Sequence, residues 1–97
     1  MSTQPGPETV PALPRGVRLR HDPARGGWVL LAPERIVTLD EIAHAVVALV
    51  DGERDLATIA DALAKEYAAD AGDILTDIAE LVASLHDRGL LDLRAAR

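Results

Sequence analysis

The chain has 97 residues, a net charge of −6 and no cysteine. This length suits one domain with a modest core, and the lack of cysteine excludes disulfides, thiolate nucleophiles and cysteine-ligated metal sites. The sequence has neither an apolar run long enough to span a membrane nor the start of a signal peptide, so it predicts a cytoplasmic protein.

The charge is divided unevenly along the chain. Residues 1–35 carry five arginines against three carboxylates, whereas residues 36–97 carry five cationic side chains against 13 carboxylates. A protein that docks on duplex DNA usually presents a cationic element to the groove. The acidic second part therefore argues against nucleic acid as a partner.

Residues 1–14 contain four of the six prolines and almost no apolar periodicity. This composition predicts a disordered N-terminal segment ahead of a folded domain at residues 15–97. Removal of residues 1–13 is then expected to leave stability nearly unchanged, because disordered ends bury little surface.

Three short strands are expected next. Residues 17–21 alternate apolar and polar side chains, and the turn residues 22–27 separate them from an apolar strand at residues 28–32, which together predict a hairpin. The β-branched stretch 35–39 predicts a third strand.

Three amphipathic helices follow. The first is expected over residues 39–51, with a capping box formed by Thr38 and Glu41. The second follows a cap at Asp55, and the third opens near Asp73 and closes at Gly89. Residues 90–93 are compatible with a short strand or with simple packing. The pattern predicts an α+β fold, winged helix-turn-helix-like, with a three-stranded antiparallel sheet packed on three α-helices.

No catalytic or metal-binding motif stands out. His21, His44 and His86 share no metal-ligand spacing, and neither Ser2 nor Ser84 lies in a nucleophile elbow. The acidic helix faces are typical of solvated surface. We therefore expect no enzyme activity, no metal and no cofactor.

Several motifs in a fixed order resemble one family. They are R-L-R-x-D at residues 18–22, W-V-L-L-x-P-E at 28–34, D-G at 51–52, L-x-x-I-x-x-x-L at 56–63 and D-I-x-x-x-V-x-x-L-x-x-R-G-L-L at 77–91. Together they resemble the pyrroloquinoline quinone (PQQ) biosynthesis protein D family (PqqD), a recognition element for ribosomally made precursor peptides. The resemblance implies a non-catalytic peptide chaperone that binds the precursor PqqA and presents it to the radical SAM enzyme PqqE. Because some members are fused to a neighbouring enzyme, it also implies association with other enzymes of PQQ biosynthesis.

The expected mode of binding is strand addition. An exposed sheet edge offers unpaired N–H and C=O groups to an extended peptide, and an apolar floor beside it selects side chains. The resemblance places this groove between the third strand and the third helix, whereas periodicity alone indicates only that the apolar stripe of that helix is core. The residues expected to contact peptide are Arg35, Ile36, Val37, Thr38, Leu39, Leu75, Ile78, Val82 and Leu85.

Other functions remain open at this point. A recognition element of another ribosomal peptide pathway would share the pattern, and a winged-helix DNA-binding regulator would share the outline of the fold. A purely structural or dimerising protein is a third possibility, and an enzyme is the least favoured.

Overall fold

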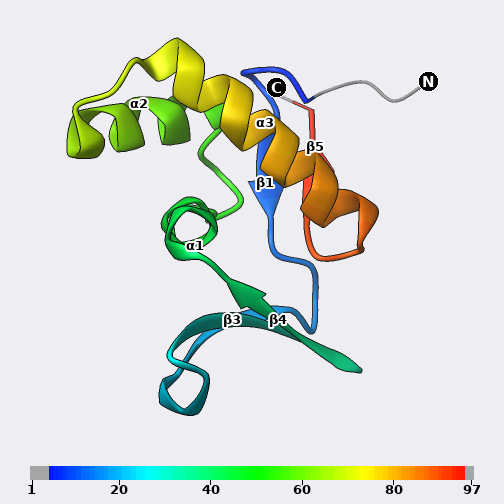
Figure 1. The fold of residues 1–97 in the computed structure, drawn as a ribbon. Coiled ribbons are helices and arrows are strands. Elements are labelled where there is room, and N and C mark those ends of the chain that lie inside the picture. Colours follow the sequence, from blue (N-terminus) through cyan, green and yellow to red (C-terminus); the bar gives the residue numbers. More distant parts are fainter. Residues whose placement is uncertain (1–4, 96–97) are drawn as a thin grey trace.

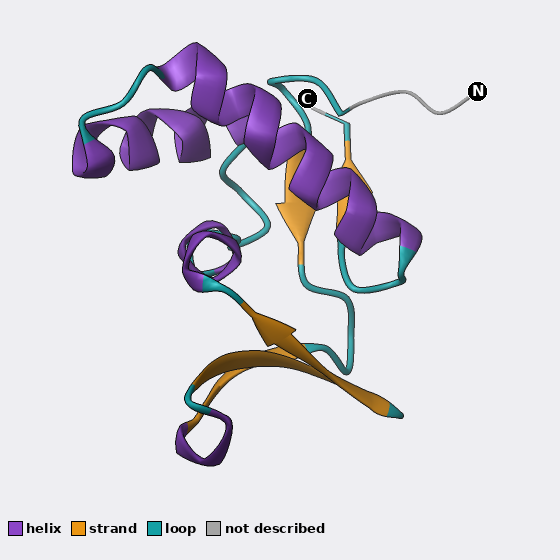
Figure 2. Ribbon diagram, viewed as in Figure 1, coloured by secondary structure: helices purple, strands orange, loops and turns teal. Residues whose placement is uncertain are grey.

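The computed structural model describes residues 5–95, without the side chain of Arg25. Residues 1–4, part of the expected disordered segment, and residues 96–97 lie outside the described residues. The elements in chain order are β1 (Val10–Ala12), β2 (Arg18–Asp22), the 3-10 turn η1 (Pro23–Arg25), β3 (Gly27–Ala32), β4 (Arg35–Leu39), α1 (Glu41–Val47), α2 (Leu56–Tyr67), α3 (Ala71–Asp87) and β5 (Asp92–Arg94) (Figures 1 and 2).

The predicted three-stranded antiparallel sheet is confirmed. Its order is β2–β3–β4, so β2 and β4 are its edges, and the ladder pairs Leu30 with both Leu19 and Val37. In Figure 1 this sheet lies at the bottom, α1 lies above it, and α2 and α3 form the upper layer. The α+β class with three helices is therefore confirmed, and β4 has the bounds expected from the sequence.

One face of the sheet packs on the helices. Successive side chains of a strand point to opposite faces, so Leu30, Val37 and Leu39 share the face that contributes to the hydrophobic core. Trp28 is on the same face and stacks on His44 of α1, with ring centroids 4.3 Å apart and planes 9° from parallel. This stack ties α1 to the sheet.

Each helix begins at an aspartate. Asp40 caps α1, and its carboxylate accepts a hydrogen bond from the Ala43 N–H at 2.7 Å. The expected capping box at Thr38 is wrong, because Thr38 is still in β4 and Asp40 is closer to the first free N–H groups. Helix α1 also ends at Val47, earlier than residue 51.

The other two helix starts follow the same rule. Asp55 caps α2 as expected, and its carboxylate accepts from the Thr58 N–H at 2.8 Å. Asp70 caps α3 through the Asp73 N–H, so this helix begins at Ala71, two residues before the expected position. Where several acidic residues lie close together, periodicity alone did not identify which of them is the cap.

Helix α3 ends in a Schellman motif. Gly89 is left-handed with φ +75°, its N–H donates to the His86 carbonyl, and the Leu90 N–H donates to the Leu85 carbonyl. Leu85 and Leu90 are both buried in the core. The chain then reverses into β5.

The expectation of disorder before residue 15 is wrong for the segment that forms β1. Val10–Ala12 pairs with β5, and Pro11 and Ala12 are buried. The carbonyls of Pro7 and Thr9 accept hydrogen bonds of 2.9 Å from the first N–H groups of α2. Proline is compatible with a short edge strand, since an edge N–H need not pair. The four prolines of residues 1–14 were therefore a misleading sign of disorder.

The core lies between the sheet and the helices. Its fully covered members include Leu30, Val46, Leu56, Ile59 and Val82. No helix within residues 5–95 is long and apolar enough to cross a bilayer.

Candidate functional site

Strand β4 has an open edge. It pairs with β3 on one side, and no other strand within residues 5–95 pairs with it. Its side chains alternate: Arg35, Val37 and Leu39 are on the helix side, while Ile36 and Thr38 are exposed on the outer face. The main chain of β4 is therefore available for pairing with an extended segment.

The hairpin loop indicates which N–H groups face this open edge. Residues 33–34 form a two-residue connection closed by the pair Ala32–Arg35. Such a connection closes on a hydrogen-bonded pair, and the pairs alternate along the ladder. We therefore expect the N–H groups of Arg35, Val37 and Leu39 to point into the sheet, and those of Ile36 and Thr38 to point outward.

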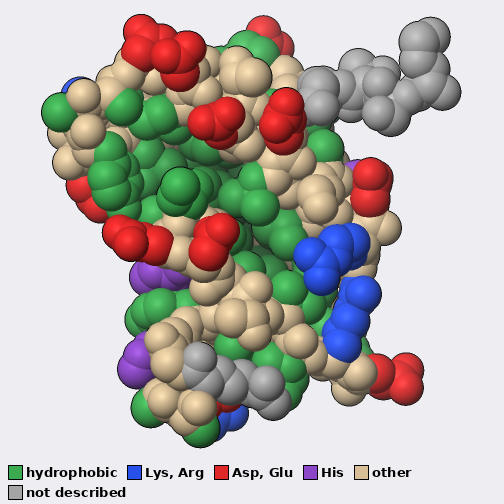
Figure 3. All heavy atoms as spheres, viewed as in Figure 1, with side chains coloured by type: hydrophobic (Ala, Val, Ile, Leu, Met, Phe, Trp, Pro, Cys, Tyr) green, Lys and Arg blue, Asp and Glu red, His purple; other side chains and the backbone are tan. Residues whose placement is uncertain are grey.

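An apolar cavity of about 560 Å³ opens beside the end of β4. Figure 3 shows it as a hollow of hydrophobic side chains near the centre of the face, with carboxylates above and below. It is enclosed by α1, the last turns of α2 and the first three turns of α3. Its lining residues are Asp40, Glu41, Ile42, Ala43, Ala45, Val46, Leu63, Tyr67, Ala69, Ile74, Asp77, Ile78 and Leu81.

Two large apolar side chains of the lining are strongly exposed. Ile42 is 70% exposed and Tyr67 is 48% exposed. Partial desolvation, followed by the negative charges of Glu66 and Glu41, raises the pKa of Tyr67 above its ordinary value of 10.0. Isolated exposed apolar residues are ordinary, but two at the mouth of one apolar cavity make this cavity a candidate site of interaction.

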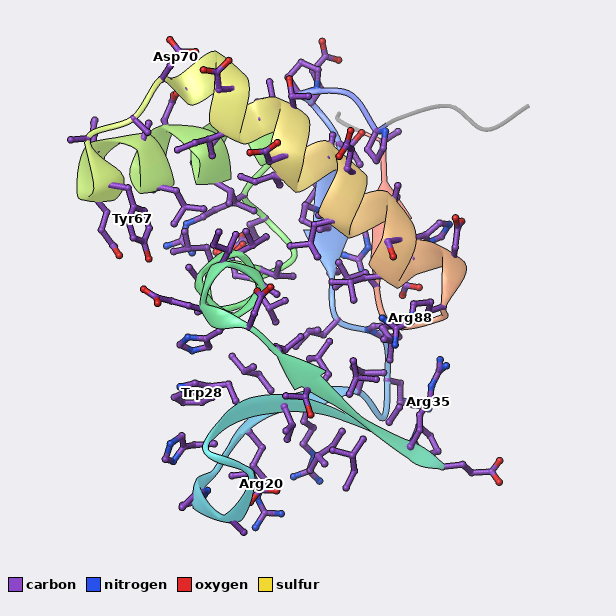
Figure 4. The ribbon with its side chains drawn as sticks, in the orientation of Figure 1. Arg20, Trp28, Arg35, Tyr67, Asp70 and Arg88 are labelled. Carbon is purple, nitrogen blue, oxygen red and sulfur yellow. The ribbon has the colours of Figure 1, made fainter. Side chains whose placement is uncertain are left out.

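A hydrogen bond joins β4 to the end of α3. The Arg35 guanidinium donates to the carbonyl of Arg88, the residue that precedes the left-handed Gly89. In Figure 4 both arginines lie at one end of this face and Tyr67 lies at the other. This bond links the first residue of β4 to the C-terminal end of α3.

The structure separates the expected site residues into three groups. Arg35, Ile36, Val37 and Thr38 lie on β4 with their main chain at the open edge. Ile78 belongs to the core with 2% of its surface exposed, and that small exposed part lies in the wall of the cavity. Leu39, Val82 and Leu85 have side chains in the core, at 8%, 0% and 2% exposure. Leu75 lies on another flank of α3, in a depression shared with Pro5 and Pro7. Contact with a peptide stays a prediction for all of these residues, and the main chain of β4 is the part of the set that the structure leaves most accessible.

The sequence did not indicate that four of the lining residues are accessible at the surface. Ile42, Tyr67, Ile74 and Leu81 belong to the apolar stripes of the helices, and such stripes normally predict core. They remain accessible because α1 is short and leaves the space between α2 and α3 partly open. The position of Ile42 in the first turn of α1 was the only local signal.

The three histidines make structural contacts. No cluster of three or more His, Cys, Asp or Glu side chains suited to a metal occurs in the described part of the chain. Trp28 lies between His44 and His21, whose ring centroid is 5.1 Å away, and Nδ1 of His86 is 2.9 Å from the Leu91 carbonyl. These histidines support α1 and the end of α3.

Named proteins from Xanthomonas are similar to this chain in sequence. A protein of Xanthomonas campestris pv. campestris named "PqqA binding protein" is 55% identical over 86 residues, which are 89% of this chain and 94% of the relative. Its namesake from Xanthomonas oryzae pv. oryzae is 58% identical over 83 residues, covering 86% of this chain and 90% of the relative.

Two solved structures are also similar. The PqqD truncation of Methylobacterium extorquens PqqCD, described as a functional and stand-alone recognition element for ribosomally synthesised and modified peptides, is 48% identical with a TM-score of 0.76. That match covers 86% of this chain and 88% of the other. PqqD from Xanthomonas campestris is 56% identical with a TM-score of 0.58, covering 84% and 90%.

These relatives are named as binding proteins and recognition elements rather than as enzymes. The family described as Coenzyme PQQ synthesis protein D (PqqD) matches residues 27–91, which include β3, β4, all three helices and the Schellman turn. The edge strand and the cavity walls thus all lie within the matched region. The chain belongs to the PqqD family.

Proposed function

We propose that this chain is a non-catalytic recognition element that binds the precursor peptide PqqA as an added strand along β4. The observation that carries the proposal is the open edge of β4 next to an exposed apolar cavity. The names of the relatives, "PqqA binding protein", supply the identity of the peptide.

The mechanism divides affinity and selectivity between two parts of the site. Main-chain hydrogen bonds to β4 accept many sequences, because every residue except proline offers the same donor and acceptor. Side chains at alternate positions of the added strand reach the cavity, where size and polarity select among them. Strand β4 has five residues, which corresponds to a paired length of about 16 Å.

The protein presents its ligand and leaves the chemistry to a partner. PqqA bound along an edge strand keeps its flanking residues free for the radical SAM enzyme PqqE, the partner implied by the family resemblance. The longer PqqCD protein of Methylobacterium extorquens supports association with other enzymes of PQQ biosynthesis. We place this step in the cytoplasm, where ribosomal precursors are made.

The structure disfavours binding to DNA. Helix α3, which would be the recognition helix of a winged-helix regulator, exposes Asp73, Asp77, Glu80 and Asp87. A duplex would be repelled by this helix at low salt, where electrostatic effects are greatest.

A pair of proline substitutions tests strand addition. Ile36→Pro removes a donor that faces outward, so the protein is expected to fold and to bind synthetic PqqA roughly tenfold or more weakly. Val37→Pro removes a donor of the existing ladder and a half-buried side chain, so its main effect is a loss of stability of about 3 kcal/mol or more.

The measurements are calorimetric titration with synthetic Xanthomonas campestris PqqA and circular dichroism to establish folding. Ile36→Ala is the matched control, since it removes the same side chain and keeps the N–H. A folded Ile36→Pro variant that binds like the parent would show that the peptide does not pair with this edge. A parent protein that does not bind PqqA would remove the proposed function itself.

A further inference from the structure

The two ends of the proposed site carry opposite charge. At the cavity end, the carboxylates of Glu41 and Asp77 are exposed members of the lining. Neither has an ion-pair partner within residues 5–95. The raised pKa of Tyr67, caused in part by Glu41, is a second sign of negative potential there. This end of the site would attract a cationic side chain.

The opposite end, called the basic end below, carries the two arginines of the site, which follow the exposed carboxylates of Glu34 and Asp87 in the sequence. Arg35 and Arg88 are both exposed and are joined by the bond from the Arg35 guanidinium to the Arg88 carbonyl. That bond leaves the guanidinium of Arg88 free to turn toward a ligand, and no carboxylate of the described residues forms an ion pair with either arginine. Figure 4 places both residues away from Tyr67 and the cavity. This end would attract a carboxylate.

The direction of β4 relates these charges to the polarity of a bound peptide. Strand β4 runs from Arg35 at the basic end to Leu39, which precedes the acidic cavity. Antiparallel pairing is the more stable arrangement of two strands. An added strand therefore begins near Leu39 and ends near Arg35.

We propose that charge fixes the direction in which a peptide lies in this site. The preferred segment carries a cationic residue and a bulky apolar residue in its N-terminal half, and an anionic residue in its C-terminal half. The apolar side chain enters the cavity, the cation meets Glu41 and Asp77, and the anion meets Arg35 and Arg88. This inference rests on the proposed function and extends it to a class of peptide.

Two synthetic peptides of the same composition test it. Both have an extended apolar centre; one has lysines upstream and glutamates downstream, and the other has the reverse order. Calorimetry at low salt is expected to show a roughly tenfold preference for the first, since several exposed pairs each contribute a small amount. The preference is expected to shrink at high salt.

Charge reversal locates the effect. Arg88→Glu and Asp77→Lys should each reduce the preference several-fold and weaken binding of the first peptide. Arg20→Glu, on the opposite edge strand β2, and Asp61→Lys, on the side of α2 away from Leu63, are matched controls that change net charge equally and should leave the preference intact.

Each outcome decides the proposal. Equal binding of the two designed peptides overturns the directional inference and leaves the proposed function standing. The same holds if synthetic PqqA binds but the designed peptides do not, and neither Arg88→Glu nor Asp77→Lys affects the binding of PqqA. Failure to bind PqqA removes the proposed function. In that case the designed pair still decides the preference, because selective binding of the first peptide supports it and equal or absent binding overturns it.

Discussion

Ile42 allows the contribution of the cavity to be measured separately from folding. Its side chain is 70% exposed at the mouth of the cavity, so Ile42→Ala removes apolar surface that the folded protein alone does not bury. Alanine is also the better helix former, and we expect the free energy of unfolding to change by less than about 0.5 kcal/mol.

The expected effect on affinity follows from the exposed fraction. Full burial of an isoleucine side chain stabilises by about 1.5–3 kcal/mol, so covering the exposed 70% contributes about 1–2 kcal/mol. This corresponds to a dissociation constant roughly 5- to 30-fold higher in Ile42→Ala. Only binding that covers Ile42 produces this loss.

The assay is titration of parent and variant with synthetic PqqA by calorimetry, with urea unfolding to compare stability. Ile42→Leu keeps the apolar area and is expected to bind within about twofold of the parent. If Ile42→Ala binds as tightly as the parent, the peptide does not cover the mouth of the cavity, and the site must be limited to the edge of β4.

Two further predictions concern the fold. Deletion of residues 1–13 is expected to lower the melting temperature by several degrees or more, because it removes β1 and the two carbonyls that cap α2; an unchanged melting temperature in a thermal scan would contradict the structure. Asp55→Ala should cost about 1 kcal/mol at neutral pH. Hydrogen bonds from the Thr58 side chain and main chain lower the pKa of Asp55 below 3.8, so the stability it adds is present above that pH and is lost as the pH falls through the lowered value. Urea unfolding of parent and Asp55→Ala should converge in acid, and a constant difference would rule out this role of the carboxylate.

The parts of the fold that the sequence predicted are those governed by local pattern. Strands β2, β3 and β4 show alternation or β-branching over five or six residues, and they are joined by turns rich in Gly and Pro. Strand β1 could not be predicted in this way. It has three residues, one of them proline, and its partner β5 lies about 80 residues later in the chain. Its stability comes from tertiary pairing and from the free N–H groups of α2.

The same limit applies to the candidate site, because local pattern does not show which apolar residues stay exposed. The family resemblance placed the groove at the third strand, and the strand order β2–β3–β4 makes that strand an edge. Periodicity marks Ile42 and Val46 as members of one apolar stripe, yet Ile42 is 70% exposed and Val46 is fully buried. Only the length of α1 and the packing of α2 against α3 decide which residues of a stripe stay open to a ligand.

The anchoring of the N-terminal segment has a consequence for gene fusion. The relative from Methylobacterium extorquens was cut from a longer protein, PqqCD. In the present chain, Pro5 and Pro7 line the same depression as Leu75 of α3, and the segment then continues into β1 (Figure 1). A domain joined through a short connection ahead of Pro5 would sit at the layer of α2 and α3, at the far side of the molecule from the three-stranded sheet. An upstream enzyme could then share the chain without covering the edge of β4, so fusion and peptide capture are geometrically compatible.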